Sequence, residues 1–206
     1  MRSPLELIYK FHWILPGEAA RAAQMPAFLL VPLLASRDIR SVVNLRGEHS
    51  DFAWWRRERN ACDANAIMHF DAALDSRSLP TRAMLVSLMD AFEAAPQPVL
   101  IKCAGGQDRT SLAAALYIIY RKGFPARDEA LAQFQAMPYL HLPRRHQRWL
   151  KQFPLYAESQ AQHRPLAAWI REDYDPHAFA AWLNERGMGG DFKEVYIRPR
   201  DRLRQV

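Results

Sequence analysis

The chain has 206 residues, of which half are hydrophobic and 24% are charged, as expected for one globular domain rather than a disordered chain. It has only two cysteines, Cys62 and Cys103, which excludes a disulfide scaffold and favours a reducing compartment. No apolar run is long enough to span a membrane and no signal-peptide pattern begins the chain, so we expect a cytoplasmic protein. The net charge of +6 favours anionic partners, but no basic stripe of the kind that binds nucleic acid stands out.

Short apolar runs alternate with helical segments, and this pattern predicts an α/β fold. Extended segments or strands are expected at residues 7–15, 41–45, 66–70, 99–102 and 194–197. Helices are expected at residues 26–36, 52–61, 81–94, 109–122, 128–137, 144–160, 165–172 and 176–186. Thr81 is the expected cap of the third of these helices, and Gly123 is expected to end the fourth. No clear linker divides the chain, and the segment that most resembles a linker is near residues 160–165.

The most informative segment runs from a strand through a glycine loop into a helix. Cys103 ends the strand at 99–102, Gly105 and Gly106 permit a tight loop, and Arg109 begins a helix that is apolar nearly all round. Successive loop N–H groups can converge on a phosphate, and the helix N-terminus adds further free amides and its dipole. The residues expected to bind phosphate are Ala104, Gly105, Gly106, Gln107, Asp108 and Arg109.

The same surroundings suit a reactive cysteine. A free thiol has a pKa near ~8.5, and a helix N-terminus with nearby cations lowers it, so Cys103 is the expected nucleophile. Arg109 can hold two phosphate oxygens at once, and Thr110 can donate its hydroxyl to the sulfur when it leaves. The nucleotide-binding pattern G-x4-G-K-[ST] is absent, which disfavours an NTPase.

Residues 103–110 resemble the signature loop of the cysteine-dependent protein tyrosine and dual-specificity phosphatases. The Asp-Arg-Thr ending is similar to that of bacterial tyrosine/lipid phosphatases and of myotubularins. Further similarity to the bacterial members covers roughly residues 10–160 and lies at residues 16–17, 21–26, 39–46 and 128–133. The resemblance implies a short, mainly parallel central sheet flanked by helices. It implies a dual-specificity-type phosphatase domain at residues 1–160, with residues 161–206 as a helical extension docked on it.

The resemblance also implies hydrolysis of a phosphate monoester through a phosphocysteine on Cys103, with Arg109 and the loop amides holding the phosphate oxygens. No metal or cofactor is expected. The implied substrate is a phosphorylated protein or an anionic phospholipid headgroup. Asp71, after a predicted strand, and Asp108, inside the loop, are nearly equal candidates for the general acid, and Asp75 is a weaker third.

Three residues depart from the family pattern. Lys102 stands where a histidine usually precedes the cysteine, Gln107 where many lipid-active relatives carry lysine, and Ser111 where glycine is common. Lys102 and Gln107 therefore leave open a phosphate-binding pseudophosphatase. A rhodanese-like sulfur transferase is a further alternative, although Arg109 followed by Thr110 argues against it.

For several other residues the sequence gives only weak evidence of a function. Arg46 and Arg77 are candidates for the mouth of the site, or are solvated surface residues. Cys62 is a buried structural cysteine or a disulfide partner of Cys103. The basic cluster at Arg144, Arg145 and Arg148 is read as a solvated helix face.

Overall fold

The computed structural model describes residues 4–193, and the strand expected at 194–197 lies outside them. The strands are β1 (His12–Leu15), β2 (Ala19–Ala23), β3 (Ser41–Asn44), β4 (Met68–Asp71) and β5 (Val99–Cys103). The α-helices are α1 (Pro4–Ile8), α2 (Ala27–Ser36), α3 (Ala53–Ala64), α4 (Arg82–Ala94), α5 (Asp108–Lys122), α6 (Arg127–Ala132), α7 (Trp149–Ala161), α8 (Leu166–Glu172) and α9 (Pro176–Glu185). Two 3₁₀ turns, η1 (Phe124–Ala126) and η2 (Arg145–Gln147), precede α6 and α7.

The five strands form one sheet in the order β1-β2-β5-β3-β4. The pairs β2–β5, β5–β3 and β3–β4 are parallel, and β1 pairs antiparallel with β2 at one edge. The expected mainly parallel sheet flanked by helices is therefore confirmed. β5 lies at the centre, between β2 and β3, so the residues that follow it emerge in the middle of the carboxyl edge of the sheet.

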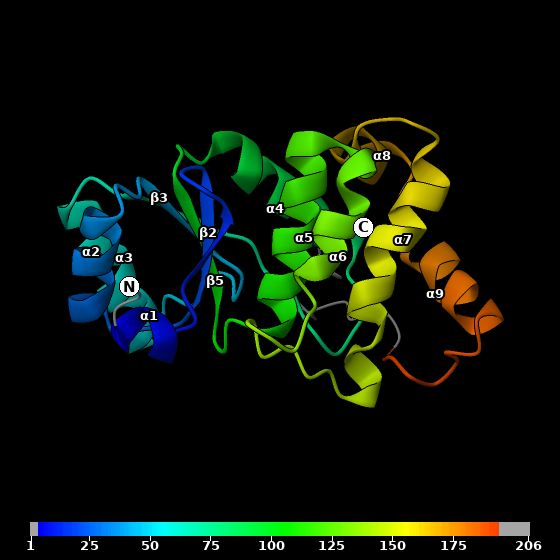
Figure 1. Ribbon diagram of the computed structural model, residues 1–206, viewed down its shortest axis with the longest axis horizontal. Coiled ribbons are helices and arrows are strands. Elements are labelled where there is room, and N and C mark those ends of the chain that lie inside the picture. Colours follow the sequence, from blue (N-terminus) through cyan, green and yellow to red (C-terminus); the bar gives the residue numbers. More distant parts are fainter. Residues whose placement is uncertain (1–3, 194–206) are drawn as a thin grey trace.

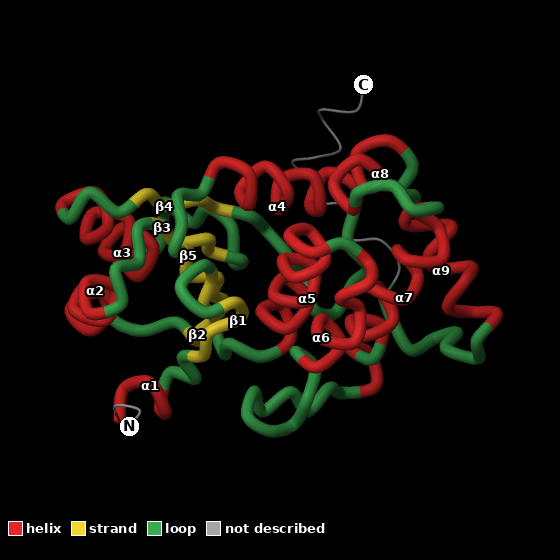
Figure 2. The backbone as a smooth tube through the Cα atoms, turned by 45° about the horizontal axis from the view of Figure 1, so that its top comes forward, coloured by secondary structure: helices red, strands yellow, loops and turns green. Residues whose placement is uncertain are grey.

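Helices cover both faces of the sheet (Figures 1 and 2). On one face α2 and α3 pack on the smaller core, which includes Leu30, Cys62 and Leu100. On the other face α4, α5 and α7 pack on the larger core, which includes Ile101 and Cys103. Alternation along β5 thus sends Leu100 to one face and Cys103 to the other.

The helices α8 and α9 belong to the larger core. Trp169, Tyr174 and Phe179 are buried against α7, and the Tyr174 hydroxyl donates to the Pro80 carbonyl over 2.8 Å. α8 also packs on α4. Among residues 4–193, no helix is both long and apolar enough to cross a membrane.

Four segments differ from the sequence-based expectations. β2 was not expected, because its sequence Ala-Ala-Arg-Ala-Ala has no β-branched or aromatic residue, yet all five residues are buried. The extended segment expected at 7–15 begins as the end of helix α1 and becomes a strand only at His12. The helix expected at 128–137 begins at Arg127 and ends at Ala132, where a turn at residues 133–134 follows. The helix expected at 144–160 starts as a 3₁₀ turn and becomes α-helical at Trp149.

Candidate active site

The loop after β5 turns sharply between strand and helix. Cys103 is the last residue of β5, and α5 begins only five residues later at Asp108. Gly106 has φ +64°, and a Cβ there would lie 2.6 Å from the backbone N of Ala23. The turn therefore needs glycine at this position, because only glycine permits both this backbone conformation and the close approach to β2.

The Cys103 thiol lies inside this loop, and the loop lowers its pKa. Burial acts to raise the pKa of Cys103, but the Arg109 charge, the Thr110 hydroxyl and the backbone N–H groups of Gly106 and Gln107 outweigh it and lower the pKa. The Thr110 hydroxyl is buried and has no other hydrogen-bond partner within residues 4–193, so it is available to the sulfur. The loop thus favours the thiolate of Cys103, which is the nucleophilic form of a cysteine.

Asp108 lies beside the thiol loop, in the first turn of α5, with its side chain 25% exposed. Its Oδ2 accepts a hydrogen bond from Gln147 Nε2 over 2.7 Å, and its Oδ1 lies 3.4 Å from Nδ1 of the buried His141. The carboxyl group is thus fixed at the edge of the loop while part of it faces solvent.

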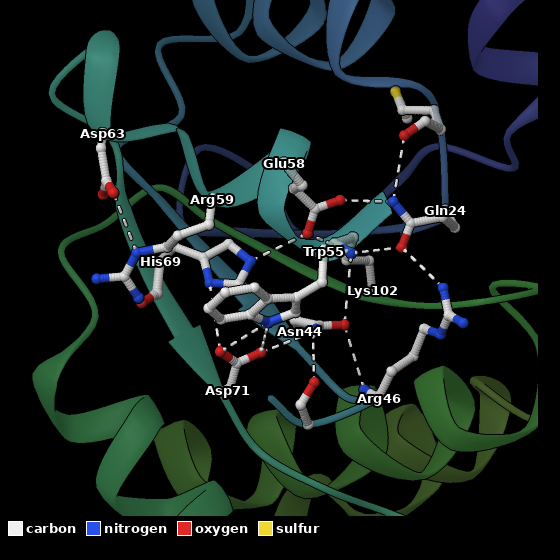
Figure 3. Close-up of polar contacts among 12 residues, drawn as sticks. Gln24, Asn44, Arg46, Trp55, Glu58, Arg59, Asp63, His69, Asp71 and Lys102 are labelled. Atoms are coloured by element: carbon white, nitrogen blue, oxygen red, sulfur yellow. Dashed lines mark hydrogen bonds and ion pairs between the residues drawn. The ribbon is translucent and has the colours of Figure 1, made fainter. Parts of the chain in front are cut away.

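Asp71 is held on the opposite face of the sheet from Cys103. Asp71 on β4 pairs in register with Asn44 on β3, and Asn44 pairs in register with Lys102 on β5. Residues paired in this way on neighbouring strands point to the same face of the sheet, so Asp71 shares the face of Lys102, opposite to that of Cys103. The Asp71 carboxylate accepts a 2.7 Å hydrogen bond from Asn44 Nδ2 and two of 3.1 Å from Trp55 Nε1 (Figure 3).

Lys102 joins the same buried cluster, which also contains Glu58, His69 and Gln24 (Figure 3). Its Nζ lies 2.5 Å from Glu58 Oε1 and donates to Gln24 Oε1 over 2.8 Å. Glu58 also contacts His69 Nε2 at 3.0 Å. Lys102 therefore points to the α3 side of the sheet and makes no hydrogen bond to the thiol loop through its side chain.

Asp75 lies on the loop between β4 and α4. Its Oδ1 accepts from the backbone N–H of Arg77 over 2.9 Å, and its Oδ2 contacts the Ser78 hydroxyl at 3.4 Å. Gln147 Nε2 reaches both Ser76, at 3.4 Å, and Asp108. This contact brings the Asp75 loop next to the start of α5, whereas the Arg77 side chain is exposed.

No protein-family model matches the chain, and no curated protein matches it in sequence. Among solved structures, the core catalytic domain of the PP-IP phosphatase SIW14 from S. cerevisiae, in complex with citrate, matches with TM-score 0.50 and 16% identity over 87% of this chain and 93% of that one. The active form of Tk-PTP matches with TM-score 0.52 and 20% identity, and the match covers 70% of this chain and 95% of Tk-PTP. PTPMT1 in complex with PI(5)P matches with TM-score 0.50 and 17% identity, and the match covers 73% of this chain and 98% of PTPMT1. The fold is that of the cysteine-based tyrosine and dual-specificity phosphatases.

The Arg46 side chain lies close enough to the thiol loop to interact with its charges. Burial and the nearby charge of Arg109 lower the pKa of Arg46, whereas the Cys103 thiolate acts in the opposite direction. Its guanidinium stacks on Trp54 at 3.4 Å from the ring centroid. Trp54 also lines a groove of about 710 Å³, whose other apolar side chains include Met25 and Phe28 and whose polar side chains are Gln24, Arg57 and Asn60.

Cys62 is separate from the site. It is a free, fully buried thiol in the smaller core, on the other face of the sheet from Cys103. Burial and the charge of Glu58 raise its pKa to about 12. These facts support the interpretation of Cys62 as a buried structural cysteine rather than a disulfide partner of Cys103.

Sequence reasoning missed several residues that contact the thiol loop or Asp108. His141 and Gln147 reach Asp108 from a segment about 35 residues away in sequence, and no local pattern marks them. The sequence pattern marks Arg21 only as part of the motif at residues 21–26. In the structure it is a charged residue among four alanines in a buried strand, which needs polar partners from elsewhere, but the sequence does not indicate that this segment is a strand.

Proposed function

We propose that the protein hydrolyses phosphate monoesters through a phosphocysteine intermediate on Cys103. The observation that supports this most directly is the buried thiol of Cys103, whose pKa is lowered by Arg109, Thr110 and two loop amides at the N-terminus of α5. The same amides and Arg109 are suited to hold the three non-bridging oxygens of a phosphate.

In the first step the Cys103 thiolate attacks phosphorus, an S–P bond forms, and the bond to the ester oxygen breaks. The leaving oxygen takes a proton from a carboxylic acid. In the second step water attacks phosphorus and gives a proton to the same carboxylate, the S–P bond breaks, and the thiolate is released with inorganic phosphate. Thr110 stabilises the departing sulfur through its hydroxyl.

We assign the acid role to Asp108. It stands next to Arg109 in the loop, is part exposed and is aimed by Gln147. Asp71 remains the competing candidate from the sequence, but its carboxylate accepts three hydrogen bonds on the α3 side of the sheet, which favours a structural role.

The proposed substrate is a phosphorylated protein or an anionic phospholipid headgroup. The groove beside Trp54 is suited to the apolar part of either, and it adjoins the loop through Gln24, whose backbone N–H donates to the Ala104 carbonyl over 3.1 Å. Arg46 supplies a cation at the junction.

Release of inorganic phosphate by wild type and Cys103→Ser tests the proposal. The panel is p-nitrophenyl phosphate, phosphotyrosine and phosphoserine peptides, phosphoinositides and phosphatidylglycerophosphate, without added metal. Turnover that is lost in Cys103→Ser is the expected result, and the preferred substrate separates protein from lipid. Turnover by Cys103→Ser would refute the mechanism. Phosphopeptide or lipid binding without turnover by the reduced wild type would identify a pseudophosphatase.

A further inference from the structure

Three consecutive carbonyl groups of the thiol loop are held from outside by one stretch of the chain. The Ala104 carbonyl accepts from the backbone N–H of Gln24 at 3.1 Å. The Gly105 carbonyl accepts from Lys10 Nζ at 2.9 Å, and the Gly106 carbonyl from Arg21 Nη2 at 3.1 Å. These three donors, Lys10, Arg21 and Gln24, are called the outer clamp below.

The outer clamp determines where the loop N–H groups point. The peptide bonds of the loop are trans, and in a planar trans peptide the C=O and the next N–H point in opposite directions. A carbonyl of Gly105 or Gly106 that is held outward therefore turns the N–H of Gly106 or Gln107 inward. These are the two backbone N–H groups that donate to the Cys103 sulfur.

Arg21 is an unusual member of this clamp, because its cation is buried without an acidic partner. Its side chain is fully buried, and its guanidinium donates to the Gln133 carbonyl and Oε1 at 3.1 and 3.0 Å. It also donates to Ser111 Oγ at 2.8 Å and lies 4.2 Å from the Tyr139 ring centroid. Every one of these partners is neutral, and within residues 4–193 no carboxylate pairs with it.

Tyr139 and then Cys103 are the groups that favour the charged form of Arg21. Burial lowers the pKa of Arg21 to about 10, so it is still a cation at neutral pH, and Cys103 acts to keep it charged. A buried cation with only neutral acceptors favours any nearby anion, here the thiolate or a bound phosphate.

Ser111 is the residue that departs from the glycine common in the phosphatase signature. Its hydroxyl is buried in the first turns of α5 and accepts from the same Nη2 atom that donates to Gly106. Arg21 Nη2 thus links the loop to the helix that follows it, and the serine gives this guanidinium an acceptor that glycine lacks.

We propose that Arg21, assisted by Lys10, is a positioning residue that orients the peptides after Gly105 and Gly106 and favours the Cys103 thiolate. The proposal rests on the proposed function, because it assigns these residues a part in the same site. It concerns the thiol directly, and so it can be tested without a substrate.

The test measures the rate of Cys103 alkylation by iodoacetamide against pH, with the modified residue identified by mass spectrometry. In Arg21→Gln we expect the profile to move to higher pH and the rate at neutral pH to fall severalfold. Arg21→Lys, which retains the charge but not the planar fork, should give an intermediate profile. With a phosphatase substrate, kcat should fall about 10²–10³-fold in Arg21→Gln, as when one oxyanion donor is lost, and KM should change less.

Arg82→Gln is the matched control, because Arg82 also donates to a backbone carbonyl, that of Tyr174, but away from the loop. Its alkylation profile should equal that of wild type. If Arg21→Gln does not fold, Lys10→Met and Ser111→Ala decide the question. Lys10 is near the surface, and each variant should shift the profile in the same direction by less. Unchanged profiles in folded variants would overturn the proposal. A wild type with a low-pKa Cys103 but no phosphatase activity would instead refute only the proposed function.

Discussion

Lys102 Nζ lies 2.5 Å from Glu58 Oε1, and both side chains are almost fully excluded from solvent. Since β5 alternates its side chains, the residue before the nucleophile faces α3 while Cys103 faces α5. The departure from histidine at this position is thus accommodated by a buried ion pair rather than by a new group in the thiol loop.

Removal of one partner of this pair should be costly. We expect Glu58→Gln to lower the free energy of unfolding by about 3–5 kcal/mol, because it leaves a buried lysine without its counterion. Denaturant unfolding measures this loss. Glu129→Gln breaks the surface pair with Lys122, whose side chains are both 45% exposed, and should cost at most about 1 kcal/mol. Equal losses in the two variants would contradict the prediction.

The contribution of Glu58 should depend on pH. Burial acts to raise the pKa of Glu58, but the His69 hydrogen bond and the Lys102 charge outweigh it, and the pKa is lowered from its ordinary value of 4.5. A carboxyl with a depressed folded pKa stabilises the protein fully above 4.5 and loses that contribution as the pH falls through the folded value. The difference in stability between wild type and Glu58→Gln should therefore be constant near neutrality and shrink below pH 4.5. A difference that does not change down to pH 3 would count against this account.

Thr110→Val should slow the second chemical step more than the first. Valine has nearly the volume of threonine but cannot donate to the sulfur, so the thiolate becomes a poorer leaving group and its pKa rises. Rapid-quench kinetics with p-nitrophenyl phosphate should show a larger burst and a phosphorylated Cys103 that is detectable by mass spectrometry. A variant without accumulation of phosphoenzyme would assign the Thr110 hydroxyl a purely structural role.

Substitution should separate the roles of the aspartates. Asp108→Asn should lower kcat by about 10²–10⁴-fold on substrates with poor leaving groups, because the amide cannot give a proton. Asp71→Asn should retain kcat and instead lower the free energy of unfolding, because Asn44 and Trp55 lose a charged acceptor. Asp75→Asn is measured in parallel and should also retain kcat. A loss of kcat of this size in Asp71→Asn or Asp75→Asn, with kcat retained in Asp108→Asn, would transfer the acid role to that residue.

Two neighbouring glycines offer a matched pair. Gly106→Ala should destabilise the loop by about 1–2 kcal/mol from its left-handed backbone alone, with a further cost from the contact with the Ala23 backbone. Gly105→Ala meets only the Gln107 side chain, at 3.5 Å, and should be tolerated. Thermal unfolding and the Cys103 alkylation rate report both effects. Similar behaviour of the two variants would be inconsistent with the described loop.

The central part of the site was predictable because its signals are local. Apolar residues, glycines and an apolar helix follow one another directly from Val99 to Lys122, and this region has the expected strand, loop and helix. The Thr81 cap was equally local, and its hydroxyl accepts from Met84 N–H as expected.

The partners of the loop were not predictable, because they come from distant segments. Nothing near Lys102 in sequence identifies Glu58 as its counterion, and nothing near Asp108 identifies Gln147. β2 escaped detection for a related reason. Its four alanines and one arginine carry no strand propensity, and the segment forms a strand through its pairing with β1 and β5, which is a tertiary constraint.

The central place of β5 also affects how the molecule folds. The strand that carries Cys103 is the last of the five within residues 4–193, yet it must pair with β2 and β3 on either side. Until residues 99–103 have been synthesised, β2 and β3 have no common neighbour, and each presents an open edge. These pairings are far apart in sequence, so closure of the sheet should be slow and should coincide with formation of the thiol loop. The reactive cysteine would then become activated only when the sheet is complete.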